Sequence, residues 1–143
     1  DFHSNMFNEN KLVKLTESKT YLTNSLTLAY KGISKTMLAE YMFLPTSKFS
    51  YFNAGKADLE NAIKKEPKNP EFRYLRLLIQ LNAPYFLNYN DRITEDITFF
   101  TNNLANYRLN NYWKIKFIDK LLGANELTPQ HEANIIALKK KLI

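Results

Sequence analysis

Apolar residues recur every third or fourth position along most of this chain, with polar residues between them. That spacing places the apolar side chains on one side of an α-helix and is unlike the strict alternation of a half-buried strand. The apolar positions near 92–107, for example, are Ile93, Ile97, Phe100 and Leu104. The pattern predicts about seven helices, near 7–18, 23–43, 47–65, 70–81, 92–107, 111–122 and 128–142.

Prolines and short polar residues mark several of the predicted helix ends. Pro45 is predicted to end the second helix, because proline cannot continue a helix interior. Thr46 or Ser47 then supplies a side-chain oxygen to cap the third helix. Asn69 and Pro70 similarly predict the cap and the first residue of the fourth helix.

Later boundaries are marked in the same way. The stretch 82–91 lacks a helical pattern and is predicted to be the long irregular connection. Gly123 is placed to end the sixth helix in a left-handed conformation. Thr128 followed by Pro129 predicts a capped start to the last helix.

Composition supports an all-α domain spanning residues 1–143. The chain has 45% hydrophobic residues and only three glycines, enough apolar surface for a core and too few turns for a β-sandwich. It has no cysteine, so the sequence predicts no disulfide and no thiolate chemistry. No apolar run is long enough to predict a transmembrane segment. The net charge of +6 is too small to indicate a nucleic-acid partner.

The segment 55–67 resembles the second helix of a tetratricopeptide (TPR) hairpin. Gly55, Leu59 and Ala62 present small, large and small residues on one face, and Pro67 follows the helix end. We expect the two small residues to lie where a neighbouring helix passes close. The resemblance covers residues 26–81 and implies antiparallel helical hairpins stacked in a TPR-like array.

Three segments are similar to a group of small bacterial proteins of unassigned activity that are usually made with an export signal. These segments are LAYKGISKTMLAEYMF, SYFNAGKADLENAIKKEPKNPEFRYLRLLIQ and APYFLNYN. The resemblance implies a periplasmic or secreted location in a bacterium, and a chain starting at Asp1 fits a protein whose signal peptide was removed. A cytoplasmic location stays open, as does the oligomeric state.

The sequence offers little that predicts catalysis. Its two histidines, His3 and His131, lie far apart and form no metal-ligand pair, so we predict neither a metal nor a cofactor. Glu95 and Asp96 are adjacent, and a helix directs neighbouring side chains about 100° apart. They are interpreted as a negative first turn that suits a helix N-terminus. No catalytic residue is assigned.

Arg73, Arg76 and Gln80 form a polar stripe along one side of the fourth helix, at spacings of three and four. Arginines in this arrangement can bind a carboxylate of a partner through paired hydrogen bonds. The alternative is that they bridge to carboxylates of neighbouring helices, such as Glu40 or Glu71.

The connection 84–90 is unusually rich in aromatic residues. Tyr85 and Tyr89 are predicted to be its exposed members and candidate binding residues. Phe86 and Leu87 are expected to pack against the protein's own core.

Taken together, the sequence favours a non-enzymatic interaction module of the bacterial envelope with a protein or peptide partner. The alternative is an enzyme of unknown class with its site in a groove between hairpins. The C-terminal lysines 139–141 are interpreted as a solvated face that complements the helix dipole. They do not predict binding to nucleic acid.

Overall fold

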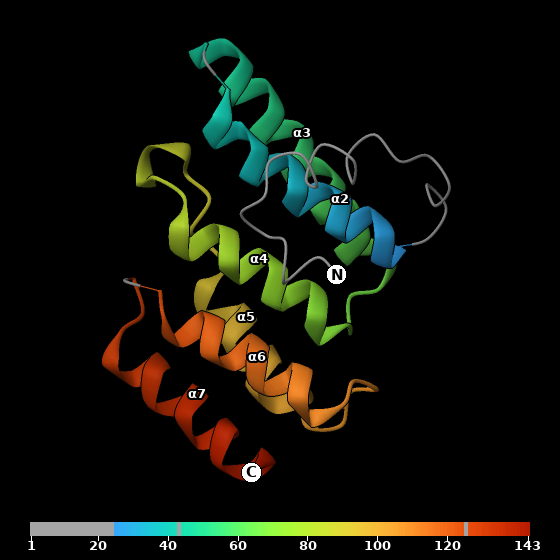
Figure 1. Cartoon of the computed structure of the whole chain (residues 1–143), viewed down its shortest axis with the longest axis vertical. Helices are drawn as coiled ribbons and strands as arrows, with labels where there is room; N and C mark the ends of the chain where they lie inside the picture. The colour runs from blue at the N-terminus through green and yellow to red at the C-terminus, as the bar shows by residue number, and fades with distance from the viewer. Residues whose placement is uncertain (1–24, 43, 125) are drawn as a thin grey trace. The chain divides into compact units, whose positions relative to one another are not determined.

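The computed structural model describes residues 25–143 except 43 and 125, and this part of the chain is all-α (Figure 1). The described residues contain no strand, which confirms the predicted fold class. They form six α-helices and two short 3-10 segments: α2 Ser25–Leu38, η2 Ala39–Tyr41, α3 Pro45–Lys65, α4 Pro70–Asn82, η3 Tyr85–Leu87, α5 Ile93–Asn103, α6 Asn111–Leu122 and α7 Pro129–Leu142. The helix predicted near 7–18 lies outside the described residues.

Several helix starts follow the predicted capping chemistry. The Asn69 side chain accepts a hydrogen bond from the backbone N–H of Glu71 at 2.9 Å. Thr128 Oγ1 accepts one from the N–H of His131 at 3.1 Å. In each case a side-chain oxygen satisfies an N–H group that has no partner within the helix.

The predicted roles of Pro45, of Thr46 or Ser47, and of Gly123 at helix ends are wrong, although α6 ends before Gly123 as predicted. Pro45 does not end the second helix but is the first residue of α3, whose N-cap is Leu44 and has no side-chain cap hydrogen bond. Proline suits this position because its missing N–H would have no helical partner. Neither Thr46 nor Ser47 caps this helix, because both lie inside it. Gly123 follows α6 with a φ of −80°, so the predicted left-handed conformation is not adopted.

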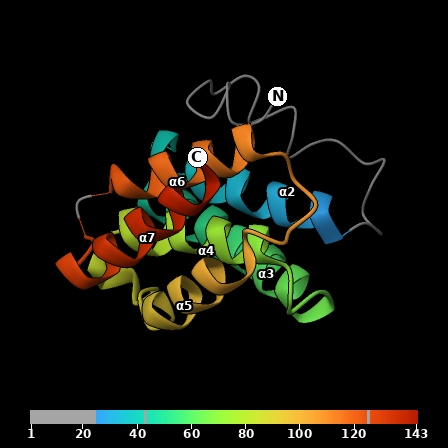
Figure 2. The ribbon, with the colours of Figure 1, turned by 90° about the horizontal axis from the view of Figure 1, so that it is seen from below.

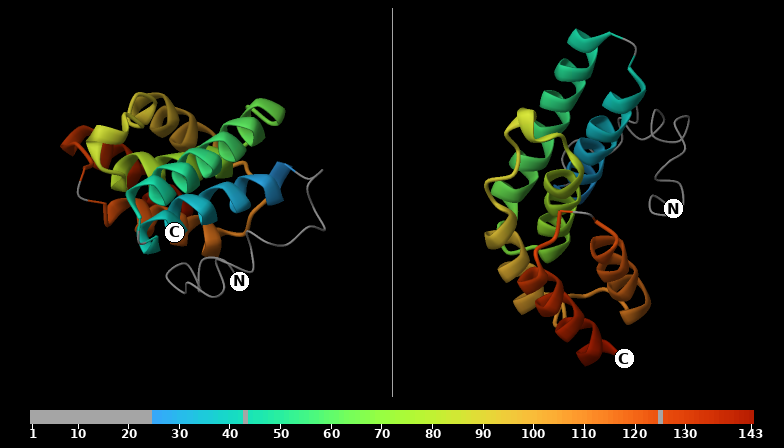
Figure 3. Two further views of the ribbon diagram at one scale, coloured as in Figure 1. Left: turned by 90° about the horizontal axis from the view of Figure 1, so that it is seen from above. Right: turned by 90° about the vertical axis from the view of Figure 1, so that its left-hand side faces the viewer.

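The chain divides into two compact units, Asp1–Phe72 and Arg73–Ile143, with the boundary inside α4. In the first unit α2 and α3 lie side by side in opposite directions (Figure 3). Their backbones approach closely at two glycines, as a Cβ on Gly32 would lie only 2.6 Å from the carbonyl oxygen of Gly55. Gly55 therefore lies against a neighbouring helix, as predicted, and Ala62 on the same helix is fully buried.

The first turns of α3 extend past the end of α2. From the contact between Gly32 and Gly55, α2 continues for six positions to Leu38, whereas α3 reaches back ten positions to Pro45. At 1.5 Å per residue, α3 runs at least four residues, or about 6 Å, beyond α2. The 3-10 segment η2 covers part of this extension, and the rest of it is open to solvent.

The second unit has an aromatic core. The Tyr74 ring stacks on Phe117 at a centroid distance of 4.1 Å and on Phe100 at 6.1 Å. These rings join α4, α5 and α6. Helix α7 packs beside both α6 and α5 (Figure 2), with Ile135 and Leu138 buried.

The described helices include none with the length and apolar character needed to cross a lipid bilayer. This agrees with the absence of an apolar run in the sequence.

Candidate functional site

The predicted polar stripe of α4 converges on one buried carboxylate, Asp96. Arg76 donates two hydrogen bonds to it, from Nε to Oδ2 and from Nη2 to Oδ1, each 2.7 Å long. Arg73 Nη1 donates to Oδ1 at 3.1 Å, and Gln80 Nε2 donates to Oδ2 at 2.8 Å. The structure thus brings all three predicted residues together, around an acid of their own chain.

The geometry of α4 and α5 explains this convergence. Residues 73, 76 and 80 are three and four positions apart, so they lie along one side of α4. Asp96 is three positions after Ile93 and four before Phe100, which places its carboxylate on the apolar side of α5. Gln80 also fixes the start of that helix, since its Oε1 accepts the backbone N–H of Arg92 at 2.8 Å.

This cluster is internal. The Asp96 side chain is 0% exposed and that of Arg76 is 5% exposed, and Gln80 is buried as well. Glu95 reaches the rim of the cluster, with its Oε2 3.6 Å from Arg73 and 3.5 Å from Arg76, while its own side chain remains 52% exposed. The stripe therefore links α4 to α5 through hydrogen bonds made within the chain.

The structure thus favours the interpretation that the arginines bridge to carboxylates of a neighbouring helix. The acids that they contact differ from Glu40 and Glu71, the two named as examples. Their close contacts are to Asp96 and Glu95, the two residues interpreted from sequence as a simple negative first turn. Glu71, one of the expected acids, accepts a hydrogen bond from the hydroxyl of Tyr30. The position of Asp96 on the apolar stripe of its helix was the sequence signal that could have identified the true partner.

In the aromatic connection 84–90, the exposure of Phe86 and Tyr89 is the reverse of the prediction. Tyr89 is only 4% exposed, so its predicted exposure is wrong, whereas Phe86 is 61% exposed. Asn88 lies between them with a left-handed φ of 53°. Leu87 is half-buried, and Tyr85 begins the short segment η3.

His131 does not belong to any metal-binding arrangement in the described part of the chain. Its Nε2 lies 3.4 Å from Thr94 Oγ1, a contact between α7 and α5. Within the described residues, no three His, Cys, Asp or Glu side chains are grouped so that they could hold a metal ion.

The exposed end of the α2–α3 hairpin carries the feature that sequence reasoning missed. Three large side chains are exposed there: Tyr41 by 45%, Leu44 by 57% and Phe49 by 47%. Phe49 is three positions before the buried Phe52, a spacing that would place both on one side of α3, but α2 ends before it can cover this turn of α3.

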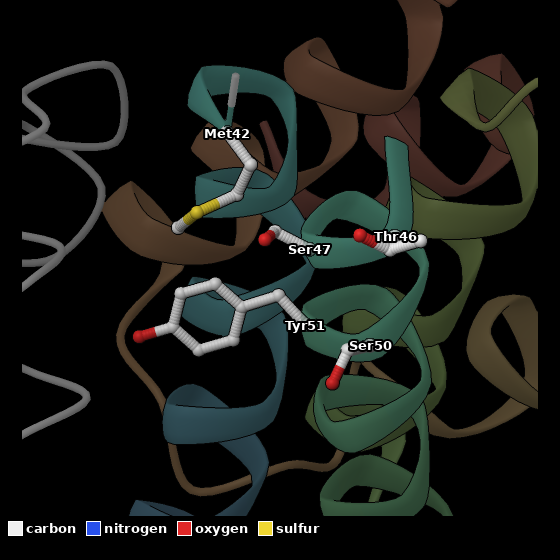
Figure 4. Close-up of a pocket in the computed structure, with 5 residues that line it drawn as sticks. All are labelled: Met42, Thr46, Ser47, Ser50 and Tyr51. Atoms are coloured by element: carbon white, nitrogen blue, oxygen red, sulfur yellow. The ribbon is translucent and has the colours of Figure 1, made fainter. Parts of the chain in front are cut away.

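An open depression of about 370 Å³ lies near the start of α3 (Figure 4). It is lined by Met42, Thr46, Ser47, Ser50 and Tyr51. The lining combines a thioether and an aromatic ring with several hydroxyl groups that can donate or accept hydrogen bonds. We call the three exposed side chains and the five lining residues the hairpin-end surface.

Comparison with known proteins gives no further assignment. No family model, no curated protein and no solved structure matches this chain. The TPR-like array and the resemblance to exported bacterial proteins therefore stay predictions from sequence.

Proposed function

We propose that this protein is a non-enzymatic interaction module that binds a peptide segment of a partner protein at the hairpin-end surface. The observation that carries the proposal is the exposure of Tyr41, Leu44 and Phe49 near the start of α3, where an open depression also lies. Monomeric proteins seldom leave several large apolar side chains together in water without a role for them. A helix that extends past its neighbour provides a rigid platform for such side chains.

The chemistry of the surface indicates the kind of segment that it binds. Lys48 is the single charged residue between positions 41 and 51, so the surface is nearly neutral and suits an uncharged ligand. An aliphatic or aromatic side chain of the peptide would contact Leu44 and Phe49. The hydroxyls of Thr46, Ser47 and Ser50 can bond to the peptide's backbone groups.

We place this module in the bacterial envelope on the strength of the sequence resemblance alone. The alternative of an enzyme gains no support from the described residues, because the polar cluster around Asp96 is internal and its acid is already fully engaged.

A random-peptide selection tests the proposal. Peptides selected on the wild-type protein should share an aliphatic or aromatic anchor and shift the backbone amide resonances of residues 41–51. The double variant Leu44→Ser with Phe49→Ser should bind them at least tenfold more weakly, because each lost apolar contact contributes about 1 kcal/mol or more.

The matched control is Phe86→Ser, which removes an equally exposed ring from the second unit. This variant should bind the peptides as tightly as the wild type. Selected peptides that shift resonances elsewhere, or that bind the double variant unchanged, would show that the hairpin-end surface is not the binding site.

A further inference from the structure

A second exposed surface lies on α6 in the other unit. Tyr112, Lys116 and Lys120 are four residues apart and therefore follow one side of this helix. Tyr112 is 60% exposed, and both lysines are exposed. The Lys116 ammonium lies 5.2 Å from the centre of the Tyr112 ring, so the positive charge is held over an aromatic face.

Helix α7 carries a matching stripe. Lys139 and Lys140 follow Ile136 by three and four positions, and Ile143 follows them by four and three, so all four lie along one side of the last turns. Ile136 is 36% exposed and Ile143 is 86% exposed. The Lys139 side chain is about one-third exposed, and Lys140 is exposed.

Two contacts join these stripes into one surface. Lys139 Nζ lies 2.7 Å from Asp119 Oδ1, and Asp119 is next to Lys120 on the same side of α6. At the helix ends, Asn111 Nδ2 donates to the carbonyl oxygen of Leu142 at 3.3 Å. Figure 2 shows α6 and α7 running side by side. We call the combined stripes the α6–α7 surface.

This surface combines positive charge with exposed apolar groups. It carries four lysines, at positions 116, 120, 139 and 140, against two acids, Asp119 on α6 and Glu132 one turn before Ile136 on α7. Tyr112, Ile136 and Ile143 lie in the same two stripes. Lysine together with tyrosine and aliphatic residues is the composition found where a helix lies in the headgroup region of a membrane.

We propose that the α6–α7 surface docks on the face of an anionic lipid bilayer. The ammonium groups would pair with lipid phosphates, while Tyr112 and Ile136 enter the boundary between headgroups and acyl chains. A nucleic acid fits less well, because it offers the lysines phosphates but gives exposed isoleucines no apolar environment. This inference concerns a different surface from the proposed peptide site and does not depend on it.

The chain's single tryptophan provides the measurement. Trp113 is next to Tyr112, with the two rings edge to face at a centroid distance of 5.3 Å. Vesicles of phosphatidylcholine with about one-third phosphatidylglycerol should shift its emission to the blue and sediment the protein. Vesicles of phosphatidylcholine alone should do neither, and high salt should release the bound protein.

Substitutions test whether these lysines are responsible. The double variant Lys116→Gln with Lys140→Gln should bind the anionic vesicles roughly twentyfold more weakly, as each lysine near such a surface contributes about fivefold. The matched control is Lys64→Gln with Lys65→Gln, the same charge change at exposed positions of α3. It should change binding by less than about twofold, because the proposed contact is made by the lysines of α6 and α7 and not by the net charge of the chain. Ile136→Ser should weaken binding while leaving its salt dependence intact.

Several results would overturn the proposal. These are the absence of vesicle binding, equal binding to neutral vesicles, and equal losses in the two double variants. Tighter binding to an RNA homopolymer or to a polyglutamate peptide than to the anionic vesicles would assign the surface to another ligand. Circular dichroism of each variant at matched temperature confirms that the fold is retained.

Discussion

Asp96 is the residue on which the second unit most depends. Its carboxylate is withdrawn completely from water and accepts hydrogen bonds from Arg73, Arg76 and Gln80. Removing a charge from water is unfavourable unless other groups replace the lost hydration, and here three side chains do so. The same carboxylate also compensates two arginines that are themselves largely buried.

Replacing Asp96 with asparagine should therefore be strongly destabilising. The change keeps the side chain's shape but leaves Arg73 and Arg76 without their buried counter-charge. We expect the free energy of unfolding, measured by urea titration, to fall by about 3–5 kcal/mol. The control is Glu95→Gln, which removes a half-exposed acid at the rim of the same cluster. It should cost no more than about 1 kcal/mol, and equal losses would mean that burial does not set the strength of these contacts.

Helix contact in the first unit depends on the absence of two side chains. Gly32 and Gly55 let the backbones of α2 and α3 meet directly, and a Cβ on Gly32 would also lie 2.8 Å from the backbone nitrogen of Leu59. Backbone atoms held within a helix cannot move aside as a flexible side chain can. The spacing between the two helices is therefore set at this crossing.

Alanine at Gly32 should force these helices apart. Its methyl group adds about 1 kcal/mol of helix propensity, but the overlap with backbone outweighs that gain. We expect a net loss of about 1–3 kcal/mol in thermal or urea unfolding. The matched substitution is Gly123→Ala, where the nearest atom to the new Cβ lies at 3.5 Å. That variant should be as stable as the wild type or up to about 1 kcal/mol more stable. If both variants behave alike, the close crossing is not a constraint in solution.

Individual helices were the most predictable level of the structure. The sequence predicts the bounds of α6 correctly and places the caps of α4 and α7 at Asn69 and Thr128, because these signals act within one turn. The start of α3 was mispredicted because Pro45 suits the first position of a helix as well as the end of one. Local sequence does not show which helix such a proline belongs to.

The functional surfaces were far less predictable, because they depend on which elements meet. Arg73 and Arg76 have the spacing of a binding stripe, and nothing in α4 alone shows that Asp96 fills it from another helix. Tyr89 is buried and Phe86 is exposed, the reverse of the prediction, and a left-handed residue between them, Asn88, has no clear signal in the sequence pattern. Phe49 has a core-facing spacing but lies beyond the end of the helix that would cover it.

At the scale of the whole molecule, the two compact units predict where each substitution acts. The glycine crossing belongs to Asp1–Phe72 and the Asp96 cluster to Arg73–Ile143. Hydrogen exchange monitored by mass spectrometry should show that Gly55→Ala accelerates exchange mainly in α2 and α3. Asp96→Asn should do so mainly in α5 and in the part of α4 that follows Phe72. Equal acceleration in every helix for both variants would indicate that the chain opens as one cooperative unit.

Contacts between neighbouring helices join residues that are close in sequence, and this affects how the protein can fold during translation. Lys35 contacts Asp58, and Arg76 contacts Asp96, at separations of 23 and 20 positions. Segments that meet at such short separations do not have to wait for distant parts of the chain. Once Lys65 has emerged from the ribosome, both helices of the α2–α3 pair are available and can dock on each other. The first hairpin can thus bury its apolar side while the rest of the polypeptide is still being translated.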